Sequence, residues 1–383
     1  MSANDDIEHY FDTRRASYLE QYSSLDGYLG KQLFQTPKFP NLSGADVAII
    51  GIDETRGSEH FAFESKPDKI RYWLYQLVSF DNLNIVDLGN MITGLALSDT
   101  YKAIENITEF LVSKGIIPVF IGGSHDLTIP MVEGVLQTQR SIEYAVIDSR
   151  VDIQNNKTTT SRSFIGNLLN IPPSKCMGNI IAHQSYFTPN NYIAYLQENN
   201  TICYRLGILR NNIAAMEPVL RDCEVVTFDA SSVRQADMPK ATMLSPNGLY
   251  TEEACQLSSY AGRSDRAKAF GFFELADDTS TDGMSSHLAA QIIWHYLSGV
   301  SLREKDYPIA DLSIYKKIFV KSDDTETDFV FYQNEKNGRF WLEIPQKNKK
   351  DSVIVSCSVF DYKSLINKEI PDRIRYSLQK YGI

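Results

Sequence analysis

From residue 45 onward, short runs of consecutive apolar residues alternate with segments that are long enough to form helices. An apolar run without polar alternation is typical of a strand that is buried on both faces. Strands of this kind, joined by crossover helices, form a parallel sheet covered by helices on both sides. The runs expected as strands are 45–52, 83–90, 117–123, 144–150, 202–209, 223–231 and 269–275, and the helix candidates are 67–79, 101–114, 127–139, 212–222 and 251–266. The sequence therefore predicts an α/β fold of three layers.

The segments on either side of this pattern have a different character. Residues 1–44 carry a polar, Tyr-rich helical pattern that ends in TPKFPNLSG, where two prolines interrupt a helix before the first strand. After residue 300, apolar stretches are joined by polar turns, and Asn337-Gly338 is a hairpin signal. We predict an N-terminal helical extension at 1–44, an α/β domain at 45–304 and a β-rich extension with an antiparallel hairpin at 305–383.

The charge of the chain argues against several classes of partner. Asp and Glu (48) outnumber Lys and Arg (38), and the resulting net charge of −10 repels phosphate backbones and anionic lipid surfaces. No apolar run approaches the roughly 20 residues that cross a bilayer, and the first residues are acidic where a signal peptide is basic. The five cysteines are scattered without a CxxC pair, which indicates reduced thiols. We expect a cytoplasmic protein that binds neither nucleic acid nor membrane.

Polar residues with the chemistry of a metal site follow several of the predicted strands. They are His125, Asp148, Asp152, Asp229 and Glu274. Because ligands of open α/β sheets bind beyond the carboxyl ends of the strands, these side chains are expected to converge. Imidazole nitrogens and carboxylate oxygens suit manganese or zinc. Each residue alone has an ordinary structural explanation, since a histidine after Gly-Gly more often starts a helix or packs in a core than binds a metal.

Three motifs surround these residues: GGSHD at 122–126, DSRVD at 148–152 and TFDAS at 227–231. Further matching segments are TTTSRSFIG at 158–166, SPNGLYTEEA at 245–254 and FFELADD at 272–278. Together and in this order they resemble the ureohydrolase family, which includes arginase, agmatinase and formiminoglutamase, over about residues 45–300. The resemblance implies an arginase-type fold, a homo-oligomer, and manganese-dependent hydrolysis of carbon–nitrogen bonds in small guanidino or formimino compounds. The chain looks like a divergent, formiminoglutamase-like member.

The resemblance also implies a pair of manganese ions, of which only one keeps all its ligand positions. The positions of the first ion hold His125, Asp148, Asp152 and Asp229. The two positions private to the second ion hold Arg150 and Ser231, and an arginine offers no lone pair to a metal. We expect Arg150 to pair with Asp148 or Asp229 and to replace the second ion electrostatically. One Mn²⁺ remains compatible with the sequence, and none binds if Arg150 fills the site.

Other positions of the resemblance concern catalysis and the pocket. Glu274 corresponds to the glutamate that faces the substrate, and Ile165 stands where arginase has a proton-shuttling histidine. We therefore assign Glu274 and Arg150 as the candidate catalytic residues. The expected pocket residues are Ser124, Asp126, Thr159, Ser161, Ile165 and Asn247.

Two functions follow from this pattern, and the sequence leaves both open. The first is a catalytically impaired or non-catalytic descendant that binds a small molecule or a partner. The second is a hydrolase with one manganese ion, which acts on an amidino or formimino carbon while Glu274 binds the cationic nitrogens. We favour the first, because Arg150, Ser231 and Ile165 all depart from the family pattern. A structural role, with the C-terminal hairpin as the docking element, is a third alternative.

Overall fold

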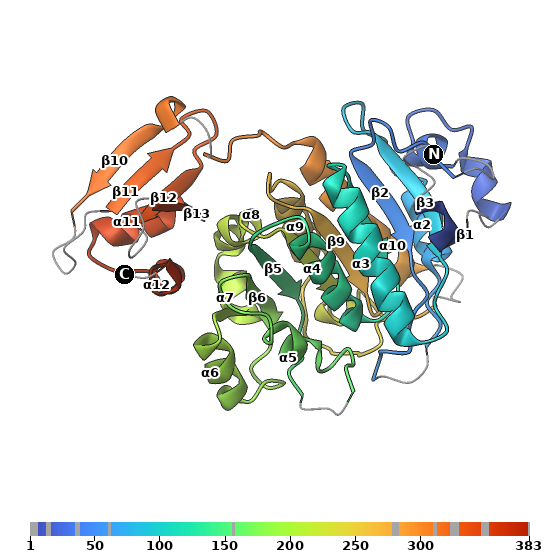
Figure 1. The fold of residues 1–383 in the computed structure, drawn as a ribbon, viewed down its shortest axis with the longest axis horizontal. Helices are drawn as coiled ribbons and strands as arrows, with labels where there is room; N and C mark the ends of the chain where they lie inside the picture. Colours follow the sequence, from blue (N-terminus) through green and yellow to red (C-terminus); the bar gives the residue numbers. More distant parts are fainter. Residues whose placement is uncertain are drawn as a thin grey trace.

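The computed structural model describes residues 7–12, 17–34, 39–59, 63–154, 158–277, 283–308, 312–321, 329–345 and 352–381. Its main body is a nine-stranded sheet between two layers of helices, as the apolar runs predict (Figure 1). The strands are β1 (Phe11–Asp12), β2 (Val47–Gly51), β3 (Ile85–Met91), β4 (Ile117–Ile121), β5 (Ile142–Ile147), β6 (Cys176–His183), β7 (Thr201–Arg205), β8 (Val225–Asp229) and β9 (Ala269–Phe273). The helices are α1 (Leu29–Leu33), α2 (Pro67–Leu74), α3 (Leu97–Ser113), α4 (Thr128–Leu136), α5 (Phe164–Leu168), α6 (Asn190–Glu198), α7 (Leu206–Asn211), α8 (Glu217–Arg221), α9 (Thr251–Gly262) and α10 (Met284–Ser301). The predicted three-layer α/β fold is confirmed.

The order of the strands places the candidate site. The sheet runs β1-β3-β2-β4-β9-β8-β5-β6-β7, and β2 to β9 pair in parallel, while β1 pairs with β3 in the antiparallel direction. Four neighbouring strands in the middle, β4, β9, β8 and β5, are the ones followed by candidate site residues. Since parallel strands end at the same edge of a sheet, residues far apart in sequence come together there.

Side chains that alternate along each strand build two separate cores. In β2, Val47 and Ile49 pack into one core while Ala48 and Ile50 pack into the other. The first core includes residues of α2, α9 and α10, and the second includes residues of α3, α4 and α5. In Figure 1 the helices α3 and α4 lie in front of the sheet. A sheet buried on both faces explains why its strands read as continuous apolar runs.

Several elements differ from the sequence prediction. The expected strand at 202–209 divides into β7 and α7, because Leu206 and Leu209 are spaced for one face of a helix and both are buried. The helix expected at 212–222 begins as a 3₁₀ turn, η4 (Ile213–Met216), before α8. Strand β6 and helix α6 were not among the predicted elements. In β6 the polar Asn179 and His183 interrupt the apolar pattern, which hid the strand.

The N-terminal segment is helical in part and also contributes to the main sheet. Its described portion contains the 3₁₀ turns η1 (Glu8–Tyr10) and η2 (Ser17–Tyr22) and the helix α1. Strand β1 joins the edge of the sheet beside β3, which the helical pattern did not predict. The prolines Pro37 and Pro40 were expected to interrupt the pattern; Pro37 lies outside the described residues, and Pro40 is buried just before the first core strand.

The C-terminal segment forms a second, antiparallel sheet. After η6 (Leu312–Ile314), its strands are β10 (Lys316–Val320), β11 (Phe329–Gln333), β12 (Phe340–Pro345) and β13 (Ser352–Cys357), and α11 (Val359–Ile366) and α12 (Asp372–Tyr381) follow. The strands pair in chain order, and the predicted hairpin at Asn337-Gly338 joins β11 to β12 with Gly338 at φ +74°. Arg221 of α8 donates to the carbonyls of Phe340 and Cys357, both at 3.1 Å, and lies on the Trp341 ring. The expected antiparallel extension is confirmed, and it docks through this buried arginine.

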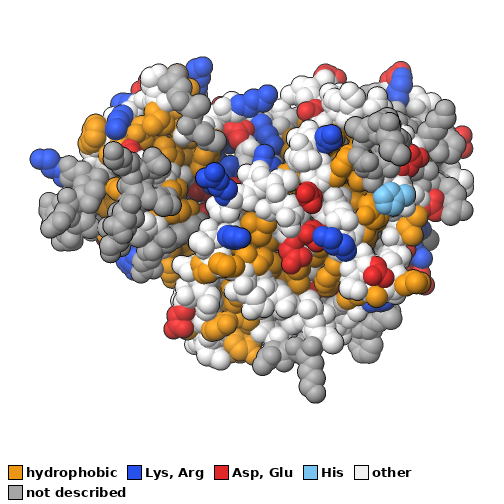
Figure 2. Space-filling view, viewed as in Figure 1, with side chains coloured by type: hydrophobic (Ala, Val, Ile, Leu, Met, Phe, Trp, Pro, Cys, Tyr) orange, Lys and Arg blue, Asp and Glu red, His pale blue; other side chains and the backbone are white. Residues whose placement is uncertain are grey.

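The described helices include none long and apolar enough to cross a membrane. On the face drawn in Figure 2, Lys and Arg side chains lie interspersed with Asp and Glu and with uncharged surface.

Candidate functional site

Two glycines carry the chain from β4 into the site. Gly122 and Gly123 have φ values of +86° and +85°, which residues with a side chain rarely adopt. A Cβ on Gly122 would lie 2.6 Å from the carbonyl oxygen of Ile52, so the neighbouring loop also requires glycine here. The turn places His125 at the start of the 3₁₀ turn η3 (His125–Leu127), where its side chain is fully buried.

His125 is held at both ring nitrogens. Its Nδ1 lies 3.1 Å from Asp229 Oδ2 and 3.5 Å from Asp148 Oδ2, while Nε2 lies 3.1 Å from Thr227 Oγ1. Thr227 and Asp229 are two residues apart on β8, so both side chains point to the same face. Burial opposes protonation of His125, but the hydrogen bonds to Asp148 and Asp229 outweigh it and raise its pKa to about 10.

Three carboxylates crowd this end of the sheet with different protonation preferences. Burial and the neighbouring Asp148 raise the pKa of Asp152 and also that of Asp229. For Asp148, burial is outweighed by the hydrogen bond and charge of His125, and its pKa is lowered. Buried carboxylates at this spacing remain ionised only beside a cation. Among the described residues, Nδ1 of His125 lies against two of these carboxylates.

One nitrogen of His125 and one oxygen each of Asp148 and Asp229 lie within 4.8 Å of one another. This set of one imidazole and two carboxylates fits a single divalent ion such as Mn²⁺. Asp152 is not part of the three-residue group. Within the part of the chain that the structure describes, its Oδ1 accepts no hydrogen bond and lies 3.4 Å from Nε of Arg162, whereas its backbone oxygen accepts from the amide of Ile165.

Arg150 does not form the expected pair with Asp148 or Asp229. Its guanidinium lies 3.9 Å over the ring of Phe187, its Nε is buried without a hydrogen-bond partner, and no carboxylate of the described chain lies within 4.0 Å of it. Only the backbone amide of Arg150 contacts the cluster, at 3.0 Å from Asp148 Oδ1. An aromatic face receives the cation, while Asp148, Asp152 and Asp229 act on it electrostatically without forming an ion pair. Burial and the nearby Arg162 lower the pKa of Arg150.

Ser231 occupies the other position expected for a second ion. Its backbone amide donates to Asp229 Oδ1 at 2.6 Å, and its hydroxyl donates to the same oxygen. A serine hydroxyl supplies no anionic oxygen, and here it is already engaged. Neither Arg150 nor Ser231 therefore offers a ligand, and the residues present do not fit a second ion.

Glu274 closes the site from β9. Its backbone has φ +60°. Two hydrogen bonds connect it to the turn after β4: its amide donates to the carbonyl of Gly123 at 2.9 Å, and its Oε1 accepts from the amide of His125 at 3.1 Å. Its Oε2 accepts from Thr242 at 2.5 Å and from Ser58 at 3.3 Å. Burial and the charge of Asp229 raise the pKa of Glu274 to about 8. With the amide of Thr242 donating to the Glu274 carbonyl at 3.0 Å, the strained backbone is held by five hydrogen bonds at the candidate site.

Of the other expected pocket residues, Ser124, Asp126 and Ser161 lie along the 54–59 loop, which also contacts Glu274 through Ser58. Ser124 and Asp126 are buried, and they contact the backbone oxygen of Glu54 and the hydroxyl of Tyr101 respectively. The contacts of the remaining four are as follows. Ile165 is buried under the Asp152 carbonyl, Ser161 contacts the amide of Glu59, Asn247 bonds to Tyr186 and Arg210, and Thr159 borders a different cavity beside α5.

Sequence reasoning did not assign several residues that support the site. Thr227 lies inside the TFDAS motif, and its position two residues before Asp229 could have identified it as a partner of the same face. Arg162 and Phe187 come from loops, and no spacing in the sequence connects either of them to Asp152 or Arg150. Thr242 is equally remote from Glu274 in the chain.

Comparison with known proteins agrees with this arrangement. The model of the arginase family matches residues 45–298. The chain belongs to the arginase family. A formimidoylglutamase from Staphylococcus haemolyticus is 22% identical over 289 residues, covering 69% of this chain and 92% of that protein. A formimidoylglutamase from Bacillus subtilis is 20% identical, covering 68% and 89%.

Solved structures of arginase-family proteins share the fold. A formiminoglutamase from Trypanosoma cruzi, solved with Mn²⁺, superposes with a TM-score of 0.65 at 20% identity, covering 73% of this chain and all of that one. Proclavaminate amidino hydrolase from Streptomyces clavuligerus gives a TM-score of 0.61 at 17% identity, covering 73% and 98%. The chain is therefore an arginase-family protein with a formiminoglutamase-like scaffold.

Proposed function

We propose that this chain is a catalytically impaired ureohydrolase that binds one divalent cation and a small amidino or formimino ligand without assembling a dinuclear hydrolytic centre. One observation carries the proposal. The Arg150 guanidinium rests on Phe187 and the Ser231 hydroxyl is hydrogen-bonded to Asp229, so the second ion has no ligands of its own. Two-ion hydrolases use both metals to position the water and the reacting group, and a single ion positions them less completely.

The residues that would hold the remaining ion are His125, Asp148 and Asp229, with Asp152 beside them. Thr227 fixes the imidazole through Nε2, which leaves Nδ1 directed at the carboxylates. Manganese, when bound, would polarise a water molecule and the ligand. Because the Arg150 guanidinium lies on Phe187 and forms no ion pair with a described carboxylate, the cofactor we propose is one Mn²⁺ per chain.

Glu274 is the residue of this site suited to an amidino or formimino group. Its carboxyl is buried and is already fixed by Thr242, Ser58 and the amide of His125, so it needs no reordering to meet a cationic N–H group. With a pKa raised to about 8, it binds a cation most strongly after losing its proton. A ligand guanidinium or formiminium would favour that loss.

A hydrolase that works with a single ion is the second candidate. The close grouping of His125, Asp148 and Asp229 favours it, since one bound ion can also bring the pKa of a water close to 7. This candidate predicts slow but manganese-dependent turnover, whereas the first predicts ligand binding without turnover.

Product release distinguishes the two candidates. Wild type and Asp229→Asn, each supplied with Mn²⁺, would be incubated with formiminoglutamate, agmatine and guanidinobutyrate, and ammonia, formamide and urea would be measured. We expect wild type to release no more product than Asp229→Asn, while calorimetry detects binding of at least one of the compounds. Manganese-dependent release by wild type that disappears in Asp229→Asn would overturn the proposal in favour of the one-ion hydrolase. Absence of both binding and release would reject both candidates.

A further inference from the structure

Arg150 carries a charge that no described residue pairs with. Its side chain is half-buried, and its guanidinium lies 3.9 Å over the ring of Phe187. The side-chain nitrogens of Arg150 donate no hydrogen bond to a described residue, and Nε is buried. A guanidinium stacked on a ring keeps its N–H groups in its own plane, where they can still meet an acceptor at the edge. The edge of this guanidinium is therefore available to a bound molecule.

The electrostatic surroundings of Arg150 leave part of its charge uncompensated. Asp148, Asp152 and Asp229 favour its charged form, but among the described residues none of them forms an ion pair with it. Burial and the neighbouring Arg162 outweigh these carboxylates and lower the pKa of Arg150. Arg162 has a partner of its own, because its Nε lies 3.4 Å from Asp152 Oδ1. An anion bound at the Arg150 guanidinium would supply the missing opposite charge.

Hydrogen bonds between two loops hold Arg150 and Phe187 against each other. The amide of Arg150 donates to Asp148 Oδ1 at 3.0 Å in the turn after β5. The loop after β6 is fixed to this turn, because the amide of Gln184 donates to the Ser149 carbonyl at 2.8 Å. Within that loop the amide of Phe187 donates to the Gln184 carbonyl at 3.0 Å. A cation that is held in place before binding loses little conformational freedom when its partner arrives.

Arg150 and Glu274 offer opposite charges on the two sides of Asp229. Glu274 follows β9, Arg150 belongs to the turn after β5, and β8, which ends at Asp229, lies between these strands. Neighbouring strands are about 4.8 Å apart, so the ends of β9 and β5 are separated by about 10 Å. The charge of Asp229 acts on both side chains. A small molecule with a cationic group at one end and an anionic group at the other can span this distance.

We propose that Arg150 binds a carboxylate of the same ligand whose amidino or formimino group is bound by Glu274. The inference rests on the proposed function and names the class of its ligand, a compound that carries both groups. A planar guanidinium meets a carboxylate through two parallel N–H···O bonds. The second negative charge of a phosphate would be repelled by Asp148, Asp152 and Asp229, which favours the singly charged carboxylate.

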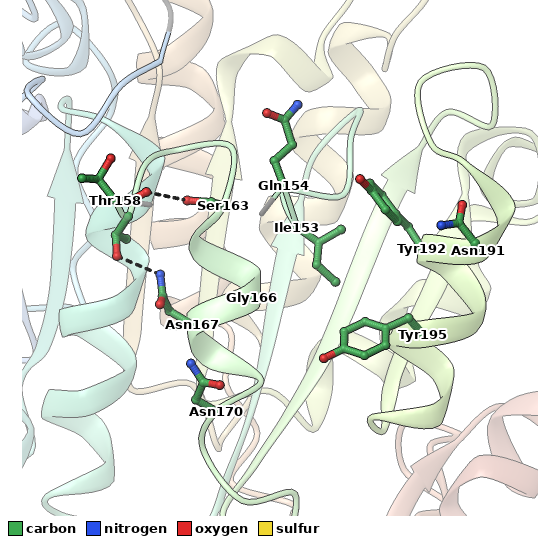
Figure 3. Close-up of a pocket in the computed structure, with 11 residues that line it drawn as sticks. Ile153, Gln154, Thr158, Ser163, Gly166, Asn167, Asn170, Asn191, Tyr192 and Tyr195 are labelled. Carbon is green, nitrogen blue, oxygen red and sulfur yellow. Dashed lines mark hydrogen bonds between the residues drawn. The ribbon is translucent and has the colours of Figure 1, made fainter. Parts of the chain in front are cut away.

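A cavity beside α5 lies close to this site along the chain but is lined by other residues (Figure 3). The described residues that line it begin at Ile153 and include neither Arg150 nor Glu274. Figure 3 shows Tyr195 of α6 reaching toward this cavity, and Tyr195 is 50% exposed. Tyr195→Ala therefore tests whether a ligand binds in that cavity instead.

Calorimetry on the full chain, supplied with Mn²⁺, tests the proposal with three compounds that share a guanidino group. Guanidinobutyrate ends in a carboxylate, agmatine ends in an ammonium group, and butylguanidine has an uncharged end. We expect guanidinobutyrate to bind about tenfold more tightly than either of the others. Arg150→Gln should abolish this preference and leave the affinity for butylguanidine unchanged. Arg150→Lys keeps the charge without the planar fork and should retain part of the preference.

Arg140→Gln is the matched control for the loss of charge. Arg140 is exposed and lies just before β5, at the opposite end of the strand from the turn that holds Arg150. Neither Arg140→Gln nor Tyr195→Ala should change any of the three affinities, and loss of the preference in either variant would overturn the inference.

The outcomes separate this inference from the proposed function. Equal binding of the three compounds by wild type, or a preference for agmatine or butylguanidine, rejects the role of Arg150 and leaves the proposed function standing. A carboxylate preference that survives Arg150→Gln also rejects that role. Loss of butylguanidine binding in both Arg150→Gln and Arg150→Lys would show a structural role and overturn the inference. Binding of none of the compounds by wild type rejects the inference together with the proposed function.

Discussion

His183 and His125 lie at the same edge of the sheet but have opposite tendencies to titrate. His183 ends β6, is 2% exposed, and has a buried Nδ1 without a hydrogen-bond partner among the described residues. Burial and the charge of Arg205 lower its pKa to about 4, whereas two carboxylates raise the pKa of His125 to about 10. Burial lowers the pKa of both rings, and only at His125 do neighbouring carboxylates reverse the direction.

The lowered pKa of His183 has a defined effect on the free energy of unfolding. The unfolded chain binds this proton near pH 6.5 and the folded chain only near pH 4, so the contribution to stability is present above pH 6.5 and is lost as the pH falls toward 4. At 1.36 kcal/mol per pKa unit, the loss is about 3 kcal/mol. His183→Asn, which does not titrate, should lack this part of the acid destabilisation.

Urea unfolding of wild type and His183→Asn at pH 7.5 and at pH 4.5 measures the difference. Other carboxyl groups titrate in the same range, but they are common to both proteins and cancel in the comparison. We expect the variant to lose less stability than wild type on acidification, and the NMR signal of His183 to remain that of a neutral ring down to about pH 5. Equal losses in the two proteins, or a ring that titrates near pH 6.5, would refute the reasoning.

Three further predictions concern the cation site and the C-terminal sheet. Arg150→His combined with Ser231→Asp restores the two missing ligands and should bind Mn²⁺ more tightly than wild type and take up a second ion; unchanged stoichiometry by elemental analysis would reject the assignment of these positions. Thr227→Val leaves Nε2 of His125 without its partner and should weaken Mn²⁺ binding by roughly tenfold in calorimetry. Arg221→Ala leaves two buried carbonyls of the C-terminal sheet unpaired and should lower the free energy of unfolding by about 2 kcal/mol, with faster proteolysis of that sheet; resistance equal to wild type would contradict its role in docking.

The main sheet could be predicted from sequence because its strands are buried on both faces. The run 117–123 has no polar side chain, and within 223–231 only Thr227 separates Val225 and Val226 from Phe228, so these patterns indicate core strands. Strand β6 escaped prediction because Gly178, Asn179 and His183 dilute its apolar pattern, although the whole strand is buried. The apolar pattern depends only on which residues follow one another in the chain, and it does not show which of them neighbouring elements will bury.

The positions of site residues could be predicted where the backbone fixes them, and could not be predicted where a long side chain can reach several partners. His125, Asp148 and Asp229 have short side chains at strand ends, so the topology of the sheet brings them together. The Arg150 side chain is long enough to reach either the carboxylates or Phe187, and it contacts Phe187, which lies in a loop beyond β6. That choice depends on tertiary packing, which sequence spacing does not encode.

Manganese content is the most direct test of a centre reduced to one cation. Wild type and Asp229→Asn would be loaded with Mn²⁺, passed through gel filtration to remove weakly held ion, and analysed for metal per chain. One retained Mn²⁺ in wild type and none in Asp229→Asn is the result predicted from the grouping of His125, Asp148 and Asp229. Two retained ions, or none, would contradict it.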